Sequence, residues 1–215
     1  MSEIANSTHR TVETTSCPFA KRAEVIHASV EGKDSEFEGI AHNIIGRVHT
    51  YIASEYDEDS DGLFVEAPAK AFGETIDDLA HAFMQLVDTI AKTEGEEIGT
   101  MLSDVETPNW QLTIRGVRFF TIVFSPIYDE SHPRHSPDPD KVQLFLQPES
   151  SFSRHIKATD GTVQNLAMKQ GVRRAFEQSG RPYDHELAAS NIEAEKYIKP
   201  QSIGQIPVLW WNSNL

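Results

Sequence analysis

The stretch that decides the fold is WQLTIRGVRFFTIVF, residues 110–124. Apolar and polar residues alternate over 110–114, which predicts a strand with one buried face. Arg115-Gly116 then predicts a tight turn. Residues 117–124 are nearly all apolar, as in a strand buried inside a sheet. The stretch therefore predicts two strands joined by a turn, and the rest of the fold is expected to pack around them.

Other segments predict helices and strands on both sides of this pair. Apolar residues recur at helical spacing in several windows, and short apolar runs bounded by proline indicate further strands. We expect a single α+β domain over residues 16–215, a small antiparallel sheet flanked by helices, after a flexible polar arm at 1–15. The expected helices are 18–27, 37–52, 72–92, 162–178 and 186–197; the further strands are 63–67 and 142–147; and the apolar segment 206–211 is expected to dock on the body.

Composition limits the possible partners. Of the 215 residues, 39% are hydrophobic and 24% are charged, which is typical of a soluble globular chain. The formal net charge of −14 repels nucleic-acid phosphates. No apolar run is long enough to span a bilayer, and the amino-terminal residues lack the layout of a signal peptide. We therefore expect a cytoplasmic protein that binds a small molecule, without nucleic acid or membrane.

The single cysteine, Cys17, precedes Pro18 at the start of an expected helix. Proline is favoured at the first helical position, so the thiol would lie near the positive end of the helix dipole. Such a thiol has a lowered pKa and acts as a nucleophile or as a metal ligand. Free cysteines are also commonly small buried apolar residues, and local sequence leaves both interpretations open.

Polar groups gather in the loop after residue 124. His132 and His135 are three residues apart and could converge on a metal, and Arg134 between them could bind a carboxylate. An ordinary surface loop has the same composition. A second polar cluster follows the strand 142–147, where sites commonly form.

Several short motifs occur in the order found in the YqcI/YcgG family, and the chain resembles its guanitoxin-type haem-dependent N-hydroxylases over roughly residues 16–200. Each motif is short, and their order is the stronger argument. The matching segments are Cys17-Pro18-Phe19-Ala20-Lys21-Arg22-Ala23, the helix 72–92, the strands 110–124, Ser131-His132-Pro133-Arg134, Gln147-Pro148-Glu149-Ser150-Ser151-Phe152, and Glu193-Ala194-Glu195-Lys196-Tyr197.

The resemblance implies a haem-dependent oxygenase that oxidises an amine or guanidine nitrogen of an amino-acid-like substrate. The relatives have histidines where this chain has Ser125 and Glu149. Cys17 is therefore the first expected iron ligand, followed by His132 and then His135. A thiolate ligand would favour cleavage of the O–O bond.

The resemblance also suggests roles for other residues. Arg134 and Arg154 are expected near haem propionates or a substrate carboxylate, and Phe120 in the apolar wall of the haem site. Glu149 and Glu193 are expected to hold a cationic nitrogen, with Tyr128 as a further substrate contact. An electron donor and a homodimer are possible partners. The alternatives are a non-haem metal or thiol enzyme using Cys17 with His132 or His135, and a ligand-binding protein without catalysis.

Overall fold

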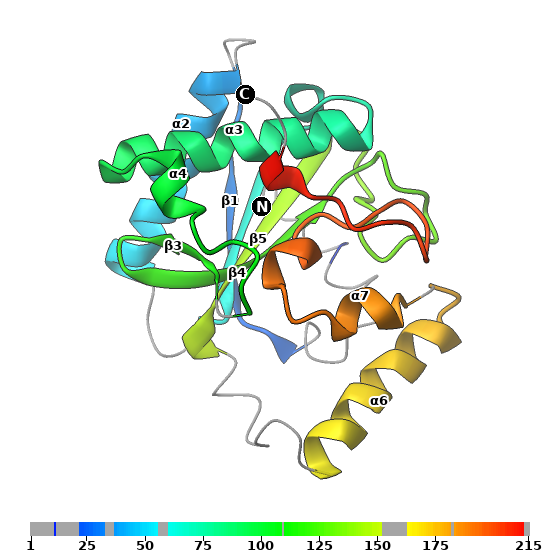
Figure 1. Cartoon of the computed structure of the whole chain (residues 1–215). Coiled ribbons are helices and arrows are strands. Elements are labelled where there is room, and N and C mark those ends of the chain that lie inside the picture. Colours follow the sequence, from blue (N-terminus) through cyan, green and yellow to red (C-terminus); the bar gives the residue numbers. More distant parts are fainter. Residues whose placement is uncertain are drawn as a thin grey trace.

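A five-stranded sheet is the centre of the structure, a computed structural model that describes residues 11, 22–32, 37–55, 60–108, 110–151, 163–181 and 183–212 (Figure 1). Its strand order is β1-β2-β5-β4-β3. The strands are β1 (Val25–Ser29), β2 (Gly62–Pro68), β3 (Leu112–Ile114), β4 (Val117–Phe124) and β5 (Lys141–Pro148). This is the predicted α+β class.

The strand pair predicted from residues 110–124 is confirmed. Leu112 pairs with Phe119 and Ile114 with Val117 in an antiparallel register. The turn between them has φ of 49° at Arg115 and 76° at Gly116. Two successive positive φ values match the twist of a two-residue hairpin turn, and glycine adopts such a value without steric cost.

The first strand corrects the sequence prediction. The helix expected over 18–27 is wrong for residues 25–27, which lie in β1; residues 18–21 lie outside the described residues. β1 runs parallel to β2, so the sheet is mixed rather than wholly antiparallel. A parallel pair needs a long crossover, and helix α2 (Phe37–Thr50) supplies it.

The long helix α3 (Ile76–Glu94) begins four residues later than predicted. Thr75 and Asp78 form a capping box, in which each side chain accepts a hydrogen bond from the other residue's backbone N–H. This arrangement satisfies N–H groups that the first turn leaves without partners. Gly95 ends the helix with φ of 77°, a left-handed conformation that favours glycine.

The helix expected over 186–197 is interrupted. The Ser190 hydroxyl accepts a hydrogen bond from the Ile192 N–H, a local contact that competes with helix continuation. The segment therefore forms α7 (His185–Ala189) and a separate 3-10 turn, η4 (Glu193–Lys196). The remaining elements are the π-helical turn η2 (Tyr51–Glu55), η3 (Ala69–Phe72), α4 (Ile98–Met101), α6 (Val163–Gln178) and η5 (Trp210–Asn212).

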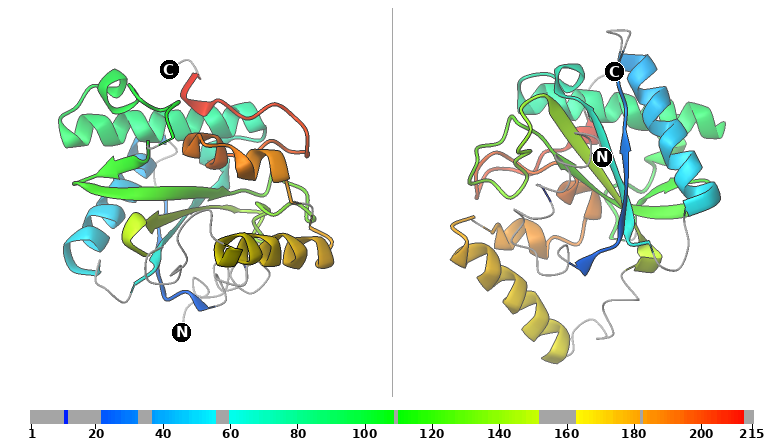
Figure 2. Two further views of the ribbon diagram at one scale, coloured as in Figure 1. Left: turned by 60° about the horizontal axis from the view of Figure 1, so that its bottom comes forward. Right: turned by 180° about the vertical axis from the view of Figure 1, so that it is seen from behind.

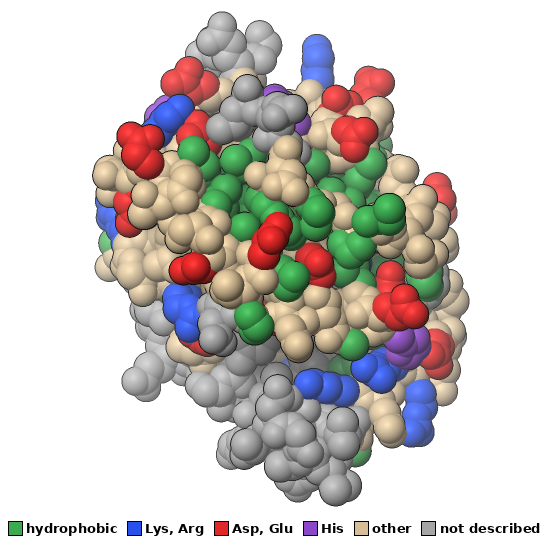
Figure 3. All heavy atoms as spheres, in the orientation of Figure 1, with side chains coloured by type: hydrophobic (Ala, Val, Ile, Leu, Met, Phe, Trp, Pro, Cys, Tyr) green, Lys and Arg blue, Asp and Glu red, His purple; other side chains and the backbone are tan. Residues whose placement is uncertain are grey.

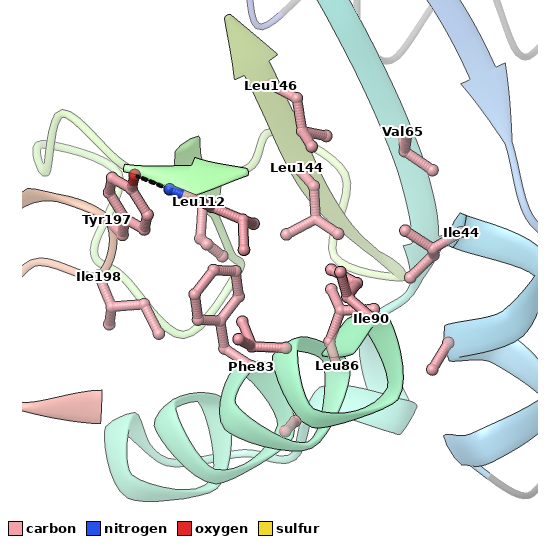
Figure 4. Packing of buried hydrophobic residues seen from close by; sticks show 14 of the residues in the cluster. Ile44, Val65, Phe83, Leu86, Ile90, Leu112, Leu144, Leu146, Tyr197 and Ile198 are labelled. Atoms are coloured by element: carbon pink, nitrogen blue, oxygen red, sulfur yellow. Dashed lines mark hydrogen bonds between the residues drawn. The ribbon is translucent and has the colours of Figure 1, made fainter. Parts of the chain in front are cut away.

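The hydrophobic core lies between the sheet and the helices α2 and α3 (Figure 4). Ile44 of α2 and Leu86 of α3 point toward Val65 of β2 and Leu144 of β5, and all four are at most 3% exposed. Burying a side chain of this size contributes roughly 1.5–3 kcal/mol. Helix α6 lies on the other side of the sheet from α3 (Figure 2, left). No helix in the described ranges is long and apolar enough to cross a membrane.

The segment predicted to dock, 206–211, does so through Trp210 and Trp211, whereas Ile206 is exposed to solvent. Trp210 is fully buried, and its ring meets Phe83 edge-on with centroids 4.8 Å apart. The Trp210 indole N–H donates to the Ala194 carbonyl at 2.9 Å. Tyr197, a few residues after Ala194, connects the same region to the sheet. Its hydroxyl accepts from the Leu112 N–H at 3.2 Å and donates to the Phe119 carbonyl at 2.9 Å.

Candidate functional site

Two loops meet at the end of the sheet where β4 stops and β5 begins. The loop 125–140 lies beside the segment 183–203 (Figures 1 and 2). The Tyr128 hydroxyl donates to the Lys199 carbonyl at 2.8 Å. The Gln201 amide donates to the Ile127 carbonyl at 3.3 Å. Hydrogen bonds therefore join residues that are far apart in the chain.

A pocket of about 250 Å³ opens between these two loops. This volume is below the range of roughly 300–1,000 Å³ that is usual for drug-sized ligands, so it suits a smaller molecule. Ionisable side chains make up much of its wall. The lining residues are Asp129, Ser131, His132, Pro133, Asp184, Lys199, Pro200, Gln201, Ser202 and Ile203.

The rings of Tyr128 and His132 stack within the first loop. Their centroids are 4.3 Å apart and their planes differ by 8°. Tyr128 is 2% exposed, and burial raises the pKa of its phenol well above the ordinary value. Its hydroxyl therefore remains protonated and continues to donate to Lys199. Because this buried hydroxyl already donates to the Lys199 carbonyl, the role of Tyr128 is to hold the Lys199 backbone in position.

His132 is a buried, neutral imidazole. Burial is the main cause that lowers its pKa to about 4; the charges of Arg134 and Lys199 act in the same direction, and a backbone hydrogen bond with Pro200 opposes them. Its Nδ1 accepts a hydrogen bond from the Arg134 backbone N–H at 3.1 Å. An amide N–H can only donate, so the proton of the neutral ring is on Nε2. Neither nitrogen then offers a lone pair to a metal, and this geometry disfavours His132 as an iron ligand.

His135 has the opposite arrangement. Its Nδ1 lies 2.7 Å from the Tyr128 carbonyl. A carbonyl can only accept, so Nδ1 carries the proton and Nε2 retains its lone pair. Histidines that bind metals commonly donate their other ring N–H to a carbonyl in this way. Of the two predicted histidines, His135 is thus the one whose hydrogen bonding fits a metal ligand.

The buried Arg134 side chain stabilises the contact between the loop 125–140 and the segment 183–203. It is 7% exposed, and its guanidinium donates to the Lys196 carbonyl at 3.0 Å. The guanidinium carbon also lies 5.6 Å from the centre of the Phe124 ring, which is within the range of a cation–π interaction. These contacts connect Arg134 to both loops, and it is absent from the lining of the pocket.

Lys199 is the lysine of the pocket, and its pKa is far below the ordinary value. Burial is the main cause that lowers its pKa to about 7; the charge of Arg134 lowers the pKa further, and Asp184 opposes the change. Its ammonium nitrogen lies 5.4 Å from the centre of the Tyr183 ring. A lysine with this pKa in a pocket marks a candidate functional site.

The other predicted residues lie away from the pocket or outside the description. Phe120 packs edge-on against Tyr197 with centroids 5.8 Å apart. Glu149 pairs with Arg118 at the surface, at 2.9 Å, and Glu193 pairs with Lys196 at 2.8 Å. Cys17, Arg154 and the arm 1–15, apart from Thr11, lie outside the described residues. Thr11 is buried, and its hydroxyl donates to the Gln143 side chain at 2.5 Å.

A haem site requires a cavity that holds a porphyrin, apolar walls and a side chain that binds the iron. The pocket of about 250 Å³ suits a small molecule rather than a porphyrin. Phe120, the residue expected in the apolar wall of a haem site, packs against the hydrophobic core. Among the described residues, no three histidine, cysteine, aspartate or glutamate side chains gather around a common point. The feature that fits an iron ligand is the free Nε2 of His135.

A second hollow, of about 480 Å³, lies between α4 and the carboxyl-terminal segment. Its wall includes Ile98, Leu102 and Trp211, and the Trp211 indole N–H donates to Glu106 at 3.2 Å. Figure 3 shows hydrophobic side chains at the centre of the face that carries these elements, with acidic side chains around them. The ionisable residues in this hollow, Asp104 and Glu106, are both acidic, whereas the first pocket also contains a histidine and a lysine.

No family model, curated protein or solved structure matches the chain. The resemblance to the YqcI/YcgG family therefore remains a prediction.

Sequence reasoning missed Lys199 and Asp184. Lys199 lies in Tyr197-Ile198-Lys199-Pro200, which has no repeating pattern and no known motif. Lys199 is half-buried because its segment lies against the loop 125–140, a contact between distant parts of the chain. The adjacent proline, which ends regular structure, was the only local signal.

Proposed function

We propose that this chain is a haem-dependent oxygenase that hydroxylates an amine or guanidine nitrogen of a small amino-acid-like substrate, bound in the pocket between residues 125–140 and 183–203. The supporting observation is that two motifs of the resemblance meet in space. Arg134 of the Ser131–Arg134 motif donates to the Lys196 carbonyl of the Glu193–Tyr197 motif. Motifs distant in sequence that converge beside a polar pocket are expected of a substrate site.

Within this proposal, Cys17 or His135 would hold the iron. Haem would supply activation of oxygen, with the electron push of a thiolate if Cys17 is the ligand. The hydrogen bond from His135 Nδ1 to the Tyr128 carbonyl would fix the ring and keep Nε2 available.

The described residues have roles that do not depend on the haem. Tyr128 and Arg134 hold the two loops together, which gives the pocket a fixed shape. The buried His132 remains neutral, and its Nδ1 accepts a hydrogen bond from the Arg134 backbone N–H within the first loop. Lys199 contributes the cation of the pocket. Together with the acidic groups of the wall, this cation can orient a molecule that carries both an acidic and a basic group.

An oxygen-transfer assay tests the proposal. The chain is loaded with haem and incubated with hydrogen peroxide and with free arginine as a guanidine-bearing amino acid. Peroxide supplies both the oxygen atom and the oxidising equivalents, so an N–H group and hydrogen peroxide yield an N–OH group and water. We expect a product with one added oxygen atom, detected by mass spectrometry. Haem-loaded chain that oxidises neither arginine nor simple amines or guanidines would contradict the proposal.

A second candidate function is ligand binding without catalysis. It is favoured by the pocket itself, whose wall presents one lysine and two aspartates to a small polar molecule. The two functions differ in one observation: the binding protein would bind small amino-acid-like molecules and show no haem absorption after reconstitution.

A further inference from the structure

The ammonium group of Lys199 lies in the pocket wall, and no carboxylate among the described residues forms an ion pair with it. Among the residues that the structure describes, no carboxylate lies within ion-pair distance of it, and its Nζ donates no hydrogen bond to a protein group. Its ring contact is the 5.4 Å approach to Tyr183. A desolvated charge without a counter-charge is costly, so native proteins usually pair such a group or use it to bind a ligand.

The acidic side chains of the pocket do not neutralise this ammonium. Asp184 caps α7 and accepts a hydrogen bond from the Leu187 N–H at 2.9 Å. Its charge acts on Lys199 only from beyond ion-pair distance. The neighbouring Lys196, by contrast, has its own partner in Glu193 at 2.8 Å. Two lysines three residues apart thus differ in whether the described part of the protein provides a counter-charge.

We propose that the pocket binds the carboxylate of a small molecule, with the Lys199 ammonium as its ion-pair partner. The inference deepens the proposed function: if that function holds, the group bound is the carboxylate of the amino-acid-like substrate. Charge-assisted hydrogen bonds of this kind contribute more than neutral ones, especially where water is excluded.

The chemistry of the wall favours a carboxylate over a phosphate. The pocket contains one lysine, together with the carboxylates of Asp129 and Asp184. Two acidic groups would repel a doubly charged phosphate, but they complement the amine or guanidine of a molecule whose other end is a carboxylate. A volume of about 250 Å³ lies below the usual range for drug-sized ligands, which suits a molecule of amino-acid size.

Chemical protection tests the ion pair directly. The full-length chain is methylated at pH 7 with formaldehyde and cyanoborohydride, in the presence of either acetate or its neutral analogue acetamide. Mass spectrometry of peptides then gives the methylation rate at each lysine. We expect acetate to slow methylation of Lys199 at least threefold relative to acetamide and to leave Lys196 unchanged. Equal rates at Lys199 in the two solutions would overturn the proposal.

A pair of matched variants provides the second readout. Acetate should raise the melting temperature of the wild-type chain and of Lys196→Met more than acetamide does, and this difference should vanish in Lys199→Met. Lys199→Arg, which keeps the charge, should retain part of it. A Lys199→Met chain that is stabilised by acetate as strongly as wild type would refute the assignment.

The test of the carboxylate site and the test of the oxygenase function can fail independently. Acetate binding is measured on haem-free chain, whose absorption spectrum verifies the absence of haem. A chain that protects Lys199 with acetate but never oxidises nitrogen supports the carboxylate site and contradicts only the oxygenase. A chain that oxidises nitrogen without acetate protection at Lys199 contradicts only the carboxylate site.

Discussion

The hydroxyl of Tyr128 donates a hydrogen bond of 2.8 Å to the backbone carbonyl of Lys199. This bond connects the loop after β4 to the segment after α7, and it fixes the backbone that carries the pocket's lysine. The donor is buried, so water cannot readily replace it. The bond therefore stabilises the fold and also fixes the position of Lys199 in the pocket.

Tyr128→Phe should destabilise the protein and weaken acetate binding together. The substitution leaves a carbonyl without its donor, at a cost of about 1–3 kcal/mol in the free energy of unfolding. Urea denaturation measures the first effect, and acetate protection of Lys199 measures the second. An unchanged unfolding free energy would show that the bond does not hold the loops together.

Lys199→Met should stabilise the protein at pH 7, and the gain should shrink as the pH rises. The lysine has a pKa of about 7 in the folded chain and an ordinary value near 10.5 in the unfolded chain. Between these values the unfolded state binds more protons, so wild-type stability rises with pH across this window. A methionine side chain at this position does not titrate, so the variant lacks this dependence.

The difference between these two proteins is best measured by urea denaturation at pH 7 and pH 9.5. One pKa unit corresponds to about 1.4 kcal/mol, so the difference in unfolding free energy should shrink by roughly 2–3 kcal/mol. Lys196→Met, at a lysine paired with Glu193, is the control. A difference that is constant with pH would mean that Lys199 has an ordinary pKa.

His132→Asn should make the protein less sensitive to acid. The folded pKa of about 4 lies below the unfolded value near 6.5, so the unfolded state takes up the proton first as pH falls. Wild-type stability is therefore lost from pH 6.5 down to 4, by roughly 2–3 kcal/mol. Asparagine keeps an acceptor for the Arg134 N–H without titrating.

The test compares the unfolding free energies of wild type and His132→Asn at pH 7 and pH 4.5. The variant should lose less stability than wild type over this interval. Equal losses would contradict a buried neutral imidazole at residue 132.

Tyr197→Phe should loosen the edge of the sheet. The hydroxyl bridges the Leu112 N–H and the Phe119 carbonyl, so its removal leaves two buried backbone groups without these bonds. We expect a loss of about 2–3 kcal/mol, seen as a fall in the melting temperature of roughly 4–12 °C for a chain of this size. A fall of less than about 1 °C would contradict this role of the bridge.

The sheet and the long helix could be predicted because their signals are local. Alternation over residues 110–114, the Arg115-Gly116 turn and the apolar stripe of α3 each reflect the geometry of a single element. β1 was missed because this edge strand is short, and no alternation of apolar and polar residues distinguishes it from a helix. Its place in the sheet depends on pairing with β2.

The site was predictable only in part. The sequence drew attention to the loop with Tyr128, His132 and Arg134; in the structure the Tyr128 and His132 rings stack, and the Arg134 backbone N–H donates to His132 Nδ1. The protonation of each histidine could not be predicted, because it depends on which backbone group each ring meets. Lys199 could not be predicted either, since its surroundings are a property of the assembled loops.

An absorption titration tests the central claim most directly. Haem is added to the full-length chain, to His132→Asn and to variants of the two candidate ligands, Cys17→Ser and His135→Ala. We predict a saturable Soret band in wild type and in His132→Asn, and a shifted or lost band in either Cys17→Ser or His135→Ala. If wild type shows no Soret band beyond that of free haem, the chain is not a haem protein and the oxygenase account is wrong.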